Sequence, residues 1–191
     1  DEVVSQIKNG NSYLVNLTCQ TPVETVFDIK TLYNIAEARY KLRYFDKFIC
    51  FTPETFVRIN DGIITSCPMK GTIDANIPFA AQKILDNIKE KAEHSTIVDL
   101  IRNDLSIVAS DVKVENFRYI DEIETGKGKL LQVSSSITGR LPDDYRSRIG
   151  DIIFSLLPAG SVTGAPKPKT LEIIRDAETY KRGFYTGIIG I

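Results

Sequence analysis

The chain has 191 residues, of which 42% are hydrophobic, so it can bury a substantial core as one large domain or two small ones. Its 24 basic and 25 acidic residues nearly cancel, which argues against a nucleic-acid partner or an anionic membrane surface. Three cysteines without paired spacing and a single histidine argue against a disulfide framework and a His-rich zinc site. The opening residues have neither a basic start nor an apolar stretch and so predict no signal peptide, and no apolar run reaches the ~18 residues that span a bilayer. We therefore expect a cytoplasmic protein with reduced thiols and no membrane partner.

The first third of the chain predicts strands around one helix. A strand is expected over residues 12–23, followed by a helix over residues 28–43 with Asp28 as its N-cap. Residues 47–66 are rich in β-branched and aromatic side chains and predict two or three strands, including a hairpin around "NDG". Lys70 then follows the end of a strand, where Gly71 lets the backbone tighten.

The rest of the chain alternates helical blocks with strand pairs. We expect a helix from about 78 that runs on through 95–104, strands at 112–120 and 129–141 around the turn "ETGKG", and helices over 143–157 and 168–180, with a loop at 158–166 between them. Hairpins dominate over strict alternation of strand and helix. The pattern therefore predicts a single α+β domain over residues 1–191 with largely antiparallel sheets.

The loop "LPAGSVTGAPK" carries the densest set of functional signals. Gly160 and Gly164 bracket Ser161, and prolines open the helix that follows. Such a loop directs free backbone N–H groups and the positive end of a helix at one place, as an anion site requires. The spacing is not that of a Walker A loop. A glycine-rich turn without a ligand remains the structural alternative.

The stretch "AEHSTIVDLIRND" places Glu93 on a largely apolar helix, with Asp99, Arg102 and Asp104 after it. One interpretation is an ion-pair network, since Asp99 and Arg102 are three residues apart. The other is that Glu93 is one carboxylate of a Mg²⁺ site, because Mg²⁺ takes one or two protein carboxylates and leaves room for water and an anionic ligand.

Glu54 and Lys70 form the third candidate. The hairpin between them can bring both to the same end of the sheet, as a salt bridge or as an acid beside a nucleophile. The residues alone leave both interpretations open.

Taken together, six segments resemble the chorismate-utilising enzymes, the family of the anthranilate, aminodeoxychorismate, isochorismate and salicylate synthases. The segments are "GNSYLVNLT", "TPE", "PMKGT", "AEHSTIVDLIRNDL", "LPAGSVTGAPK" and "RGFYTGIIG", in the family's order. The resemblance implies an antiparallel β-sandwich core flanked by helices. It also implies that the chain is incomplete at both ends and lacks the carboxy-terminal part of the site.

Within that family, the resemblance makes Lys70 the discriminating residue, because aminodeoxychorismate synthases carry lysine there and anthranilate synthases typically carry alanine. The implied reaction converts chorismate and ammonia, supplied by a glutamine amidotransferase, into 4-amino-4-deoxychorismate for p-aminobenzoate and folate. By resemblance, Lys70 is the covalent nucleophile and Glu54 the general acid, while Glu93 holds Mg²⁺. The substrate is expected to be held by four residues: Gly71, Thr72, Ser161 and Gly164.

Two substitutions depart from the family pattern. Gln132 stands where relatives usually have a histidine, so an aromatising elimination of pyruvate is less expected here. Ala159 replaces a common glycine, and we expect this change to be tolerated. The alternatives are an anthranilate- or isochorismate-type synthase and a non-catalytic module that binds chorismate or the amidotransferase.

Overall fold

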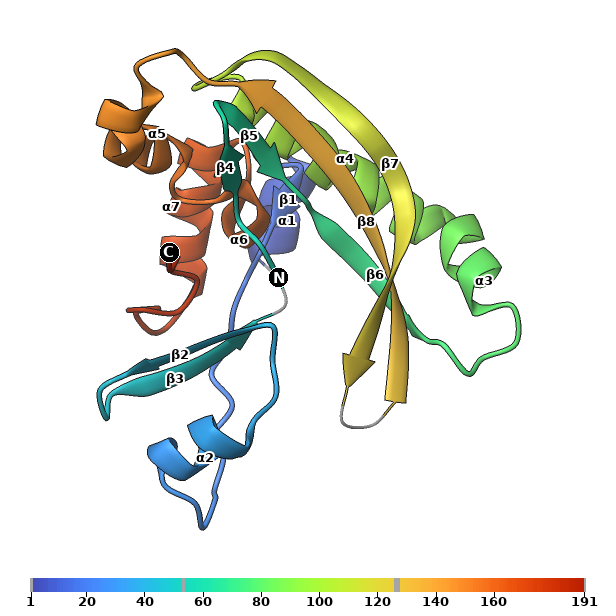
Figure 1. Ribbon diagram of the computed structural model, residues 1–191, viewed down its shortest axis with the longest axis vertical. Coiled ribbons are helices and arrows are strands. Elements are labelled where there is room, and N and C mark those ends of the chain that lie inside the picture. Colours follow the sequence, from blue (N-terminus) through green and yellow to red (C-terminus); the bar gives the residue numbers. More distant parts are fainter. Residues whose placement is uncertain (1, 53, 126–127, 191) are drawn as a thin grey trace.

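The computed structural model describes residues 2–52, 54–125 and 128–190. Helices and strands are mixed along the chain (Figure 1). The helices are α1 (Glu2–Lys8), α2 (Ile29–Ile35), α3 (Ala80–Asp86), α4 (Ile88–Leu105), α5 (Ile149–Leu156), α6 (Gly160–Thr163) and α7 (Lys167–Ala177), with a 3-10 turn at Tyr145–Arg148. The strands are β1 (Leu14–Val15), β2 (Tyr40–Tyr44), β3 (Phe48–Thr52), β4 (Arg58–Asn60), β5 (Ile63–Ser66), β6 (Met69–Asp74), β7 (Ser110–Thr125), β8 (Gly128–Arg140) and β9 (Gly164–Ala165).

The central sheet is built around the long strand β8. β7 pairs along nearly all of β8, while β5 and β6 pair with successive stretches of its other edge, and β4 adds to β5. Two small sheets, β1–β9 and β2–β3, complete the set of described strands. Every described pair is antiparallel and helices flank the sheets, so the predicted α+β class is confirmed.

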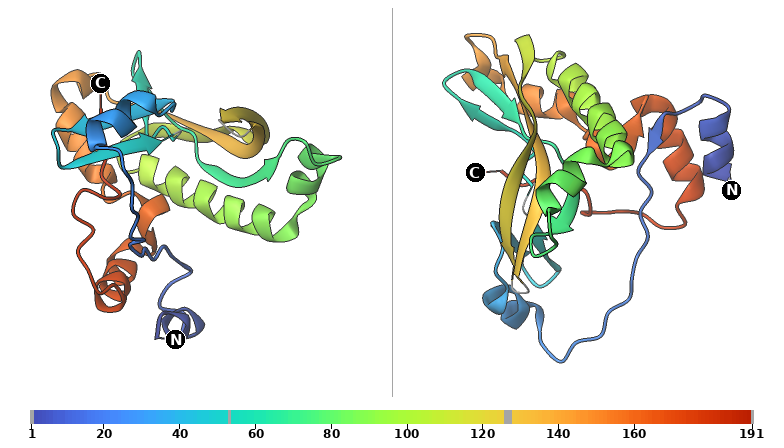
Figure 2. Two further views of the ribbon diagram at one scale, coloured as in Figure 1. Left: turned by 90° about the horizontal axis from the view of Figure 1, so that it is seen from below. Right: turned by 90° about the vertical axis from the view of Figure 1, so that its right-hand side faces the viewer.

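Helix α4 packs against β6, β7 and β8 on one face of this sheet (Figures 1 and 2). Burying each large aliphatic side chain there stabilises the fold by about 1.5–3 kcal/mol relative to leaving it exposed. The buried core joins the sheet to α4 and α5 through Ile64, Val98, Leu105, Ile137, Leu141, Ile152 and Leu156.

The predicted hairpin around "NDG" is confirmed. Asp61 and Gly62 both have positive φ, at 48° and 77°, as a two-residue turn with the twist of its strands requires. The predicted strand pair before and after "ETGKG" is also present as β7 and β8. Gly126 and Lys127 of that turn, like Pro53, lie outside the described residues.

The helix predicted over residues 28–43 is too long. Its N-cap is right, because the Asp28 carboxylate accepts the N–H of Thr31, but the helix ends at Ile35. Residues 40–44 alternate aromatic or aliphatic with basic side chains, and this period of two forms strand β2. Pairing with β3 overrides the helical spacing that the same residues show.

Other boundaries also differ from the prediction. The helix expected from 78 to 104 is two helices, because Asn87 leaves the helical conformation and caps α4 by accepting the N–H of Glu90. The opening strand shrinks to Leu14–Val15, after which the chain runs extended to α2 (Figure 2). Part of the loop at 158–166 is the short helix α6 and strand β9. No helix of the described residues is long and apolar enough to cross a lipid bilayer.

Candidate active site

A cavity of about 600 Å³ collects four of the predicted site residues, Glu54, Lys70, Glu93 and Ser161. They come from different elements: the segment before β4, strand β6, helix α4 and helix α6. The rest of the lining is Leu14, Val15, Asn16, Leu17, Pro68, Met69, Ile97 and Val162. Gly71, Thr72 and Gly164 are not part of this lining. Gly71 directly follows Lys70 and Gly164 pairs with Val15, both of which line the cavity, whereas Thr72 follows Gly71 and pairs with Gln132, which do not.

Lys70 lies inside strand β6, so the prediction that it follows the end of a strand is wrong. Met69 pairs with Ser134 and Thr72 pairs with Gln132, which leaves one extra residue in β6 and makes a bulge. Gly71 has φ +91°, so the predicted tightening of the backbone there is confirmed. The bulge re-aims the neighbouring side chains and interrupts the regular pairing beside the cavity, which resumes at Thr72.

The Lys70 ammonium lies 3.2 Å from the Glu93 carboxylate, and Lys89 approaches the same carboxylate at 3.7 Å. The Lys70 and Glu93 side chains are 45% and 35% exposed. A pair this open to water stabilises the fold by only about 0–1 kcal/mol. A bound ligand can therefore displace it at little cost.

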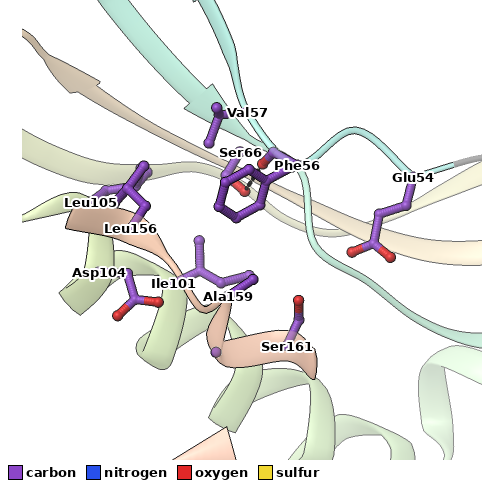
Figure 3. A pocket seen from close by; sticks show the side chains of 11 residues that line it. Glu54, Phe56, Val57, Ser66, Ile101, Asp104, Leu105, Leu156, Ala159 and Ser161 are labelled. Atoms are coloured by element: carbon purple, nitrogen blue, oxygen red, sulfur yellow. Dashed lines mark hydrogen bonds between the residues drawn. The ribbon is translucent and has the colours of Figure 1, made fainter. Parts of the chain in front are cut away.

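Glu54 lies where the open cavity meets a narrow, mostly apolar pocket of about 20 Å³ (Figure 3). Its carboxylate and the Ser161 hydroxyl lie on one side of the residues that line that pocket, with the Phe56 ring between them and Leu105 and Leu156. Glu54 is exposed to the solvent that fills the cavity. Surrounding protein atoms nevertheless replace part of the water around its carboxyl group, and this desolvation raises the pKa of Glu54. A carboxyl group with a raised pKa is suited to donating a proton.

The glycine loop, residues 157–167 ("LPAGSVTGAPK"), forms part of the wall of the same cavity through Ser161 and Val162. Strand β9 pairs with β1, and a Cβ added at Gly164 would overlap the Leu14 carbonyl oxygen. A Cβ at Gly160 would lie 2.6 Å from Leu100 of α4. Gly164 therefore allows two backbone segments to approach closely, and Gly160 leaves room for the Leu100 side chain of α4.

Asp104, from the "RND" end of α4, supports this loop. Its carboxylate lies 2.9 Å from the Lys167 ammonium and accepts the N–H of Gly160, with both side chains less than a fifth exposed. Burial raises the pKa of Asp104, and the Lys167 and Gly160 contacts act in the opposite direction. The ion pair predicted between Asp99 and Arg102 is also present, at 2.7 Å, but on the surface.

His94 anchors α4 beside Glu93. Its ring is fully buried, and Nε2 lies 2.6 Å from the Ser135 hydroxyl of β8. Burial and then the Arg118 guanidinium lower the pKa of His94, against a smaller opposite effect of the Lys70 backbone. This contact fixes the helix turn that presents Glu93 to the cavity.

Gln132 lies in β8 opposite Thr72, and its Oε1 atom is buried without a hydrogen-bond partner among the described residues. It does not line the cavity. The sequence prediction missed the wall at residues 14–17 and the role of Arg182, whose guanidinium donates to the Asn16 and Val162 carbonyls. Arg182 stands in "RGFYTGIIG", where no periodicity marks it.

The donor set fits a Mg²⁺ ion only in part. Glu93 offers one carboxylate in an open cavity, which is within the usual number for Mg²⁺. Lys70 and Lys89 would have to move away from it first. Within 2–52, 54–125 and 128–190, no three His, Cys, Asp or Glu side chains cluster as a metal site.

Comparisons with known proteins agree on one family. The model of the chorismate binding enzyme family matches residues 1–191. An uncharacterized PabA-like protein of Haemophilus influenzae is 53% identical over 99% of the chain, and aminodeoxychorismate synthase component 1 of Bacillus subtilis is 32% identical over all of it. The chain spans 58% and 42% of these two relatives. The crystal structure of anthranilate synthase component I from Streptococcus pneumoniae superposes with a TM-score of 0.69 at 25% identity, over 95% of this chain and 41% of that one. The chain belongs to the chorismate binding enzyme family.

Proposed function

We propose that this chain forms the chorismate site of an enzyme that converts chorismate and ammonia into 4-amino-4-deoxychorismate. The observation that carries the proposal is the position of Lys70, whose amine opens into the same cavity as Glu54. Relatives of both branches are equally similar, since aminodeoxychorismate synthase component 1 of Bacillus subtilis and anthranilate synthase component 1 of Acetivibrio thermocellus are each 32% identical, so the choice of branch rests on Lys70. We propose a glutamine amidotransferase as the source of ammonia and the cytoplasm as the location.

The chemistry is two successive displacements. The uncharged Lys70 amine forms a bond to C2 of the ring, the ring double bond shifts, and the C4 hydroxyl leaves as water with a proton from Glu54. Ammonia then forms a bond to C4, the double bond shifts back, and the Lys70 amine leaves C2. The sum is chorismate plus ammonia giving aminodeoxychorismate plus water. Since only the uncharged amine is a nucleophile, the ion pair with Glu93 must break before attack.

Residues around the cavity account for binding in this proposal. Ser161 lines the cavity, and Gly71 and Gly164 lie next to lining residues, so we propose that their backbone groups contribute to binding. Thr72, one residue further along β6, is proposed to contribute only if the substrate reaches past Gly71. Glu93 is proposed as one ligand of Mg²⁺, which as a Lewis acid would stabilise negative charge on the substrate carboxylate. This assignment leaves the proton transfer with Glu54.

Gln132 does not line the cavity, so it favours amination without aromatisation only as the residue at the position where relatives usually have a histidine. A glutamine can donate and accept hydrogen bonds but cannot carry a proton at neutral pH. The elimination of pyruvate that an anthranilate-type synthase performs needs such a proton transfer, so this branch is the second candidate.

The test uses the full-length protein with chorismate, ammonium and Mg²⁺, with products identified by mass spectrometry. Lys70→Ala should reduce aminodeoxychorismate formation by at least ~100-fold, as expected for the loss of a nucleophile. Lys89→Ala is the matched control, because it removes the other ammonium near Glu93 and is 80% exposed. Without ammonium, the wild-type Lys70 peptide should gain the mass of chorismate less one water.

Three results would count against the proposal. Full activity of Lys70→Ala would remove the covalent role. Anthranilate or isochorismate as the product would move the protein to the other branch. Chorismate binding without consumption would favour a non-catalytic module.

A further inference from the structure

A buried ion pair lies behind the cavity wall, between Arg182 and Glu178. The guanidinium approaches the carboxylate at 2.6 Å through Nη2 and 2.9 Å through Nε, and the two side chains are 15% and 6% exposed. Glu178 lies just past the end of α7. Neither Glu178 nor Arg182 lines the cavity.

The same guanidinium holds two segments of the wall. Nη2 donates to the carbonyl of Asn16 and Nη1 donates to the carbonyl of Val162, each at 2.7 Å. Both residues line the cavity, one after β1 and the other in α6. The segments also meet directly, because the Asn16 side-chain amide donates to the Ser161 carbonyl at 2.8 Å.

Glu178 extends the connection along the β1 segment. Its Oε1 accepts both the backbone N–H and the hydroxyl of Thr18, each at 2.9 Å. One ion pair therefore bonds residues 16 and 18 on one side and residue 162 on the other. A guanidinium can do this because its N–H donors are fixed in a plane and point in several directions, whereas a lysine offers a single nitrogen.

We infer that Arg182, oriented by Glu178, is a positioning residue that fixes the spacing between the β1 segment and the glycine loop, and through it the affinity of the cavity for its substrate. The link to affinity rests on the proposed function. Lys70 and Glu54 come from other elements, so loosening this wall should weaken binding more than it slows the chemical step.

The test compares three forms with the wild-type protein. Arg182→Met with Glu178→Met removes both charges together, which avoids an uncompensated buried charge. Arg182→Lys keeps the charge but has one nitrogen for the two carbonyls. Arg175→Met is the control, since Arg175 lies on α7 in an exposed ion pair.

Two measurements separate the inference from the proposed function. In the unliganded protein, backbone amides of residues 160–165 should exchange hydrogen at least ~10-fold faster in the double variant and in Arg182→Lys, and at the wild-type rate in the control. The KM for chorismate should rise ~10-fold in those two variants, with kcat within about twofold of wild type. Unchanged exchange in both variants would overturn the inference even if the wild type has no activity. Wild-type KM in Arg182→Lys would show that the charge alone suffices, and would overturn the role of the guanidinium.

Discussion

Gly164→Ala should be among the most damaging single-methyl changes in the chain. Gly164 has φ 123° and ψ −163°, a backbone conformation that is essentially restricted to glycine, and forcing alanine into it costs about 1–3 kcal/mol. The new Cβ would overlap the Leu14 carbonyl oxygen, so β1 must also move away from β9. Each hydrogen bond lost between those strands costs about 1 kcal/mol. We therefore expect a loss of about 3–5 kcal/mol in the free energy of unfolding.

Urea unfolding measured for both Gly164→Ala and Gly150→Ala provides the test. Gly150 lies in α5 with no atom within 4 Å of the added Cβ, and alanine is the better helix former by about 1 kcal/mol. The control should therefore be unchanged or slightly more stable. If Gly164→Ala unfolds within about 1 kcal/mol of Gly150→Ala, the close approach of β1 and β9 is not required. The account of the glycine loop would then be refuted.

Three further predictions concern titratable groups. Burial raises the pKa of Glu54, and a general acid must be protonated to act, so kcat should fall as the pH rises through that pKa. In a pH–rate profile, Glu54→Gln should lower kcat by ~10²–10⁴-fold and remove this fall in kcat. The Arg182 guanidinium lowers the pKa of Glu178 from 4.5 to about 2, so the stability that this pair adds is complete above pH 4.5 and is lost as the pH falls towards 2. In urea unfolding at several pH values, Glu178→Gln should reduce the loss of unfolding free energy between pH 4.5 and 2, and an unchanged loss would contradict the assignment. Lys167→Met leaves Asp104 buried without its ion-pair partner and should cost about 3–5 kcal/mol in urea unfolding, whereas Lys169→Met, in an exposed pair, should cost less than about 1 kcal/mol; equal losses would contradict the role of the buried pair.

Local signals in the sequence predicted local structure well. The hairpin at 60–62 follows from backbone conformations that Asp and Gly adopt readily, and the pairing of β7 with β8 follows from two strand-forming runs around a glycine turn. The helix over 28–43 failed because two periods compete in the same residues. Residues 40–44 can satisfy either one in isolation, and only the presence of β3 decides in favour of the strand.

Long-range contacts explain what the sequence could not show about the site. Glu54, Lys70 and Glu93 were all singled out from their local contexts, and all three do line one cavity. Lys70 pairs with Glu93 and not with Glu54 because helix α4 packs across strand β6. The spacing of residues along the chain does not predict this packing. Arg182 was missed for the same reason, because its partners are separated from it by up to 166 residues along the chain.

The ion pair between Lys70 and Glu93 links the nucleophilic role predicted for Lys70 to the metal-binding role predicted for Glu93. An ion pair that is 45% and 35% exposed adds at most about 1 kcal/mol to stability, so the fold does not depend on it. A covalent role for Lys70 and a metal role for Glu93 both require the pair to separate, and a ligand that engages either group lowers the cost for the other. In the proposed mechanism, ligand binding at Glu93 and nucleophilic attack by Lys70 are therefore coupled through the contact between the two side chains. This coupling predicts that substitutions at Glu93 will change the reactivity of Lys70 as well as the binding of substrate.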